Sequence, residues 1–217
     1  VRSFLERDLP ELGIRIPPSA LRRFWMMLAH YHGQTLNLSE LGRSFGVADT
    51  TVRHYVDILS GAFVVRTLPP WHENIGKRQV KAPKLYVRDS GLLHSLMGIS
   101  SFEDLHVHPK LGASWEGFAL AQILARYGAE PEEAYFWGVH SQGEIDLLIL
   151  RGSKRLGFEI KYTDQPRVTP ALRSIVKTLN LDSLEIICPG RANYQADERI
   201  AVRGLEALLS MPAAVSH

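Results

Sequence analysis

The segment "GEIDLLILRGSKRLGFEIKYTD", from Gly143 to Asp164, decides the fold of the C-terminal half of this chain. Its two apolar runs, Ile145–Leu150 and Leu156–Tyr162, have the length and composition of buried strands, and a short polar turn joins them. A buried charge is costly unless it is paired or binds a metal ion. The two predicted strands nevertheless carry three charged residues, namely Asp146, Glu159 and Lys161.

The spacing of these charges predicts that they meet. Glu159 and Lys161 are two residues apart on a strand, so their side chains leave the same face. A hairpin brings Asp146, on the preceding strand, alongside Glu159. Glu116 lies upstream on a predicted helix that can cover the sheet.

Three converging carboxylates offer the hard oxygen ligands that Mg²⁺ or Mn²⁺ prefers. Lys161 beside them can neutralise a phosphate, or orient and help to deprotonate a water molecule. The pattern therefore predicts metal-assisted hydrolysis of a phosphodiester, with Glu116, Asp146 and Glu159 as metal ligands and Lys161 as the catalytic residue. The alternative is a structural network of buried ion pairs, with Glu116 on a solvated helix face.

The N-terminal half has the pattern of a winged helix-turn-helix. Three amphipathic helices are followed by a β-hairpin with a long basic connection between its strands. The predicted helices are Ser19–His32, Glu40–Phe45 and Asp49–Gly61, and the predicted strands are Phe63–Leu68 and Lys84–Arg88.

This pattern favours DNA as a partner, although a module that binds protein or another domain is an equal alternative. The third helix presents Thr50, Thr51, Arg53 and His54 outward, as a recognition helix does. The basic connection adds Lys77, Arg78 and Lys81, which can follow a DNA backbone or dock another domain.

Composition limits the remaining choices. The 217 residues have a formal net charge of +2, and no apolar run reaches the length of a membrane span. Cys188 is the single cysteine, which excludes an internal disulfide and a thiolate-rich zinc site and favours the cytoplasm. We predict an α/β (α+β) protein with a winged-helix domain over residues 1–98 and, over residues 99–217, a mixed sheet with helices on both faces.

The run "GEIDLL…GFEIK" resembles the core of the PD-(D/E)xK phosphodiesterase superfamily, which has the restriction-endonuclease-like fold. The resemblance implies that Glu116 is the helix acid, that Asp146 and Glu159 are metal ligands and that Lys161 is the catalytic lysine. It also implies that the backbone carbonyl of Ile160 binds the metal ion.

Longer motifs, among them "PPWHENIGKRQVKAPKLYVRDSGLLHSL" and "HPKLGASWEGF", resemble the C-terminal half of bacterial and archaeal AAA-type ATP-binding proteins. In that family a P-loop ATPase domain precedes a winged helix and a nuclease-like domain of unknown function. No GxxxxGK[ST] motif occurs here, so ATP binding would belong to a domain outside this sequence. The start at Val1 rather than Met suggests a piece of a longer protein.

The resemblance implies a DNA-binding, nuclease-like region of an AAA-family ATPase, whose partners are DNA and its own ATPase domain. The alternative is a non-catalytic regulatory or scaffold module that docks the ATPase domain or a protein partner. The sequence predicts no membrane partner and leaves the oligomeric state open.

Overall fold

The computed structural model describes residues 18–73, 79–139 and 143–211. The chain divides into two compact units, the first built from residues 1–67 and 82–117 and the second from residues 68–81 and 118–217. The division falls within the long helix α7 (Leu111–Tyr127), while the sequence analysis placed a boundary after residue 98. In the described part of the chain, no helix combines the length and apolar character needed to cross a membrane.

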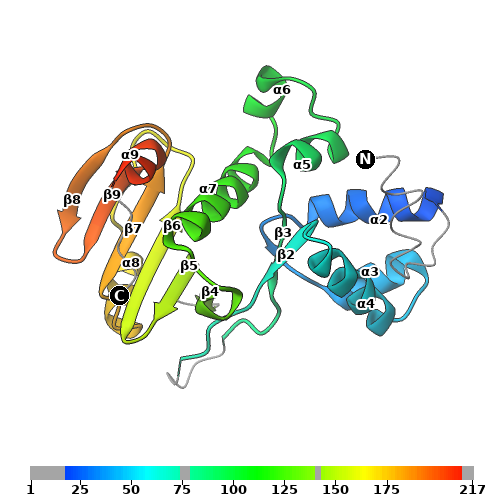
Figure 1. Cartoon of the computed structure of the whole chain (residues 1–217), viewed down its shortest axis with the longest axis horizontal. Coiled ribbons are helices and arrows are strands. Elements are labelled where there is room, and N and C mark those ends of the chain that lie inside the picture. The colour runs from blue at the N-terminus through cyan, green and yellow to red at the C-terminus, as the bar shows by residue number, and fades with distance from the viewer. Residues whose placement is uncertain (1–17, 74–78, 140–142, 212–217) are drawn as a thin grey trace. The chain divides into compact units, whose positions relative to one another are not determined.

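The first unit packs helices around a small sheet (Figure 1). The apolar stripe predicted on the first helix is buried, with Leu21, Phe24 and Leu28 in a core that also holds Leu41 and Val52. The strands have the order β1-β3-β2, so the two predicted hairpin strands are neighbours. The elements are α2 (Pro18–His30), β1 (Gln34–Thr35), α3 (Leu38–Phe45), α4 (Asp49–Gly61), β2 (Val65–Leu68), β3 (Lys84–Val87), α5 (Ser90–Leu96) and α6 (Phe102–His106).

The turn between α3 and α4 depends on two glycines. Gly46 ends α3 in the left-handed conformation, with a φ of 67°, and its N–H donates to the last carbonyls of the helix. A Cβ at Gly42 would lie 2.7 Å from the Val47 carbonyl oxygen, so only glycine allows the two helices to approach this closely.

The second unit contains a six-stranded mixed sheet with the order β4-β5-β6-β7-β9-β8, which confirms the predicted mixed α/β class. Strands β4, β5 and β6 are antiparallel, β6, β7 and β9 are parallel, and β8 returns antiparallel to β9. The elements are a 3-10 turn, η2 (Pro131–Glu133), β4 (Ala134–Val139), β5 (Gly143–Arg151), β6 (Lys154–Ile160), α8 (Pro170–Thr178), β7 (Ser183–Cys188), β8 (Asn193–Asp197), β9 (Ile200–Gly204) and α9 (Leu205–Ser210).

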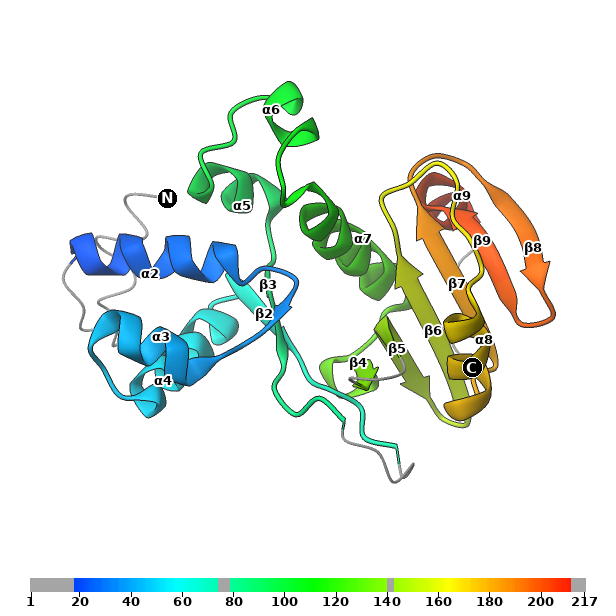
Figure 2. The ribbon, with the colours of Figure 1, turned by 180° about the vertical axis from the view of Figure 1, so that it is seen from behind.

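Helices cover both faces of this sheet, as adjacent residues of β6 show. The ring of Phe158 packs against Tyr127, at the end of α7, with ring centroids 5.3 Å apart. The next-door residue Gly157 faces the opposite way, where a Cβ would meet Leu181 just after α8. Figure 2 shows α8 on the side of the sheet that is turned away from the viewer in Figure 1.

The connection between β2 and β3, which we call the strap (residues 69–81), covers the β4 edge of the sheet. The Trp71 N–H donates to the Phe136 carbonyl, and the Phe136 N–H donates to the Pro69 carbonyl. On the returning arm, the Val80 N–H donates to the Gly138 carbonyl at 3.1 Å. Both described arms of the strap therefore satisfy backbone groups that would otherwise leave β4 as an open edge.

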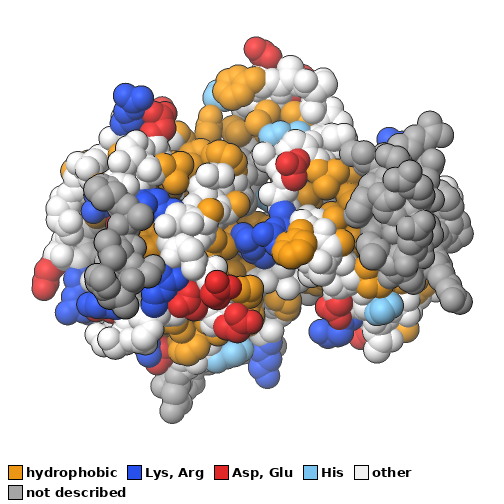
Figure 3. Space-filling view, viewed as in Figure 1, with side chains coloured by type: hydrophobic (Ala, Val, Ile, Leu, Met, Phe, Trp, Pro, Cys, Tyr) orange, Lys and Arg blue, Asp and Glu red, His pale blue; other side chains and the backbone are white. Residues whose placement is uncertain are grey.

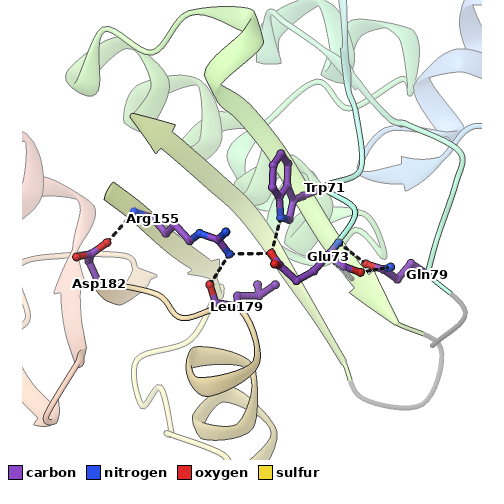
Figure 4. A network of polar contacts seen from close by, with 6 residues as sticks. All are labelled: Trp71, Glu73, Gln79, Arg155, Leu179 and Asp182. Carbon is purple, nitrogen blue, oxygen red and sulfur yellow. Dashed lines mark hydrogen bonds and ion pairs between the residues drawn. The ribbon is translucent and has the colours of Figure 1, made fainter. Parts of the chain in front are cut away.

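Side chains fasten the strap to β6 (Figure 4). Glu73 Oε2 accepts a hydrogen bond from Trp71 Nε1 at 2.8 Å and forms an ion pair with Arg155 at 2.7 Å. Gln79 bonds the Glu73 backbone in both directions, while Arg155 also donates to the Leu179 carbonyl. This partly buried network joins the strap, β6 and the end of α8.

We predict that Glu73→Gln lowers the free energy of unfolding by about 1 kcal/mol, because the charge on Arg155 loses its partner while the shape is kept. Hydrogen exchange of the Trp71 and Val80 amides should become faster. Urea unfolding and exchange measurements check both effects. Lys154→Met, which breaks an exposed ion pair on the same strand, is the control and should change stability by less than about 0.5 kcal/mol. Equal effects of the two variants would contradict an anchoring role for Glu73.

Candidate functional site

The sheet opens between β5 and β6 at the position of the two predicted strand acids. The ladder between these strands runs from the pair Arg151 and Lys154 to the pair Leu147 and Phe158 and stops there. Asp146 and Glu159 are the next residues along the two strands, and both strands continue past that point. Beyond it, β5 pairs only with β4, and β6 pairs only with β7.

A β-bulge lies at the same place. The register between β4 and β5 passes from Tyr135 opposite Leu148 to Trp137 opposite Ile145. Two residues of β5, Asp146 and Leu147, therefore lie opposite the single residue Phe136 of β4. A bulge of this kind changes the direction of a side chain, and bulges are frequent beside functional sites.

The Asp146 side chain replaces a missing ladder bond. Its Oδ2 accepts the Ile160 N–H at 2.8 Å, which ties the end of β6 to β5 where the backbone pairing has stopped. Asp146 and Glu159 are each only 7% exposed. Lys161, which is 55% exposed at its side chain, forms an ion pair with Glu159 at 2.7 Å between Nζ and Oε1.

Burial has a strong effect on the Glu159 carboxyl. The pKa of Glu159 is raised from 4.5 to about 7, chiefly by desolvation and then by the charge of Asp146, while Lys161 acts in the opposite direction. The charge of Glu144 also raises this pKa, by the smallest of these effects. Gly143 has a φ of 115° and begins β5 early, which places Glu144 on the strand.

The structure places Glu116 in the first unit, in contact with β3. Its Oε1 accepts hydrogen bonds from the Tyr86 hydroxyl at 2.6 Å and from Lys84 Nζ at 3.2 Å. Lys84 is almost fully buried, so this carboxylate neutralises a charge in the interior. The role of Glu116 as a metal ligand stays a prediction.

The described residues contain no group of three or more His, Cys, Asp or Glu side chains arranged to hold a metal ion. The buried pair of Asp146 and Glu159 nevertheless fits Mg²⁺ or Mn²⁺, because these ions are commonly bound by one or two carboxylates together with water and substrate phosphate. Burial and the charge of Asp146 raise the pKa of Glu159 despite the ion pair with Lys161. A divalent cation would balance the charge of both carboxylates.

The residues predicted to bind DNA lie mostly on exposed surface. Thr50, Arg53 and His54 are exposed on α4, while Thr51 is half-buried. Lys81 is exposed at the end of the strap, and Lys77 and Arg78 lie outside the described residues. Their role in DNA binding stays a prediction.

Sequence comparisons divide the chain into two domains of unknown function. Residues 1–103 match a domain of unknown function, DUF8612, and residues 111–208 match another, DUF4143. Uncharacterized proteins of Mycobacterium tuberculosis and Mycobacterium bovis are each 45% identical to the chain over 210 residues, which is 97% of this chain and 47% of theirs. The chain thus spans about half the length of these curated relatives. No solved structure matches it significantly.

We predict that Glu159→Gln stabilises the protein in a pH-dependent way. The pKa of Glu159 in the folded state lies above its unfolded value of 4.5, so the folded state favours the protonated carboxyl. The contribution of Glu159 to the free energy of unfolding is therefore fully present below pH 4.5 and is lost as the pH rises through about 7. At pH 8 the variant should be more stable than the native chain by about 3 kcal/mol at most, and the gap should vanish near pH 4.

Chemical denaturation from pH 4 to 8 measures this gap. Glu198→Gln, at an exposed position between β8 and β9, is the control and should show no pH-dependent gap. A Glu159→Gln variant that is less stable than the native chain at pH 8 would contradict the raised pKa.

Proposed function

We propose that the second unit is a metal-dependent phosphodiester-cleaving domain that acts on DNA and has a restriction-endonuclease-like fold. The observation that carries this proposal is the pair of buried carboxylates, Asp146 and Glu159, where β5 and β6 separate. Asp146 accepts a backbone hydrogen bond, but a purely structural core gains nothing from burying the Glu159 carboxyl beside it, where the charge of Asp146 helps to raise the pKa of Glu159. A site that binds a divalent cation does.

The residues divide the work as follows. Asp146 and Glu159 hold Mg²⁺ or Mn²⁺, which when bound would stabilise charge on a phosphate and lower the pKa of a water molecule. The Ile160 N–H holds the Asp146 carboxylate in place by its 2.8 Å hydrogen bond. Lys161, mostly exposed beside Glu159, would bind a substrate phosphate through its ammonium group or orient the attacking water.

We infer that the first unit is a winged helix-turn-helix that holds DNA. Helices α2, α3 and α4, the tight glycine turn between α3 and α4 and the paired strands β2 and β3 support this reading. The exposed residues Thr50, Arg53 and His54 of α4 would contact the DNA, and the exposed Lys81, which belongs to the second unit, would contact a DNA backbone independently of them.

The chain is also proposed to be a region of an AAA-type ATPase. The match to DUF4143 supports this, because that domain occurs at the C-terminus of such ATPases. The curated relatives have a comparable length of chain outside the matched region, which is room for an ATPase domain in those proteins. An ATPase domain of this kind would dock on the two units described above.

A scaffold without catalysis is the second candidate. The ion pair between Lys161 and Glu159 favours it, because a lysine can balance a buried carboxylate without any metal ion. In that case the two units position an ATPase or a protein partner and cleave nothing.

We predict that calorimetry detects Mn²⁺ binding to the native chain and none to Asp146→Asn, which keeps a side-chain oxygen for the Ile160 N–H but removes the charge. Lys161→Ala should bind Mn²⁺ at least as tightly as the native chain, since Lys161 competes for Glu159. Cleavage of labelled DNA should fall at least about 100-fold in both variants. Lys154→Ala, which removes an exposed lysine at the start of β6, should change neither measurement.

Two results would contradict the enzymatic proposal. The first is equal cleavage by the native chain and Asp146→Asn, which would point to a contaminating nuclease. The second is the absence of Mn²⁺ binding by the native chain, which would favour the scaffold.

A further inference from the structure

Phe63 occupies a position at the end of α4 that is ordinarily glycine. The Phe63 N–H donates to the Ser60 carbonyl at 3.1 Å, and the Val64 N–H donates to the Leu59 carbonyl at 2.9 Å. These two bonds define a Schellman motif, whose residue after the helix adopts the left-handed conformation. Phe63 is that residue, with a φ of 58°. A large L side chain is strained there, and glycine would relieve the strain at once.

The protein gains no core packing from this phenylalanine. Its side chain is 72% exposed, although it ranks among the most hydrophobic residue types. Its ring instead lies under the Arg88 guanidinium, with Cζ 5.1 Å from the ring centroid. A strained backbone and an exposed ring together point to a use outside the folded core.

Two arginines complete the cluster. Arg66, on β2, is half-buried, and Arg88 directly follows β3, where its N–H donates to the Val64 carbonyl. Burial lowers the pKa of Arg66, and the charge of Arg88 lowers it further. Among the described residues no carboxylate pairs with either guanidinium. Figure 3 shows basic and hydrophobic side chains next to each other over β2 and β3.

We propose that Phe63, Arg66 and Arg88 form a binding site for single-stranded nucleic acid. Phe63 stacks on an unpaired base, and the two guanidiniums bind the adjacent phosphates. Two arginines that pair with no carboxylate of the described residues favour a polyanion, and an exposed ring in contact with Arg88 favours a ligand that has flat faces as well as charge. An acidic peptide would satisfy the arginines but not the ring.

This site is independent of the carboxylate pair. All three residues belong to the first unit, and none belongs to the recognition surface of α4 or to the Asp146 and Glu159 site. Strand binding should therefore survive in Asp146→Asn even if that variant neither binds metal nor cleaves DNA. Failure here and failure of the proposed function are thus separate results.

Fluorescence anisotropy with a labelled oligothymidylate tests the proposal. Phe63→Gly should weaken binding at least about fivefold, while its thermal stability stays equal or rises because glycine removes the strain. In Arg66→Ala and Arg88→Ala, the slope of log affinity against log salt should become shallower by about 0.7 per arginine.

Matched controls come from the same unit. Phe102 is also exposed, at 70%, but no arginine of the described residues stacks on its ring, and Arg22 is an exposed arginine of α2. Phe102→Ala and Arg22→Ala should bind like the native chain. Unchanged binding by Phe63→Gly would overturn the proposal, as would equal competition by poly-glutamate and by unlabelled oligothymidylate.

Discussion

The separation of β5 from β6 depends on one hydrogen bond, from the Ile160 N–H to the Asp146 carboxylate. At this point the backbone ladder has ended, so a buried N–H would otherwise lack a partner. A side chain that accepts this bond allows the strands to diverge without leaving the sheet. The same bond fixes the Asp146 carboxylate close to Glu159. The carboxyl group of Asp146 therefore both satisfies the Ile160 N–H and forms the acidic pair with Glu159.

The surrounding sheet keeps this opening local. Strands β6, β7 and β9 form a parallel core with residues such as Ile186 and Val202 fully buried, and the strap satisfies the β4 edge through its bonds with Phe136 and Gly138. A rigid sheet on both sides tolerates a bulge and an unpaired segment in the middle. The stability of the well-packed and hydrogen-bonded remainder of the second unit thus offsets the cost of burying the Glu159 carboxyl.

The sequence predicted most strands and helices because their apolar residues follow clear periods. It missed β8 (Asn193–Asp197), whose mostly polar residues at a sheet edge have no apolar period. The meeting of Asp146 and Glu159 followed from hairpin spacing, whereas the bulge did not, since an extra residue in one strand leaves no mark in the sequence. The contact of Glu116 with Tyr86 and Lys84 is nonlocal and could not be read from spacing.

Glu159 and Phe63 break local rules in opposite ways. The carboxyl of Glu159 is buried although charge favours the surface, and the ring of Phe63 is exposed although its hydrophobicity favours the core. In each case a single neutral or smaller residue would remove the cost, glutamine in the strand and glycine in the turn. Stability alone therefore accounts for neither side chain. In the functions that we propose, a ligand accounts for each of them, a divalent cation for the buried carboxyl and an unpaired base for the exposed ring.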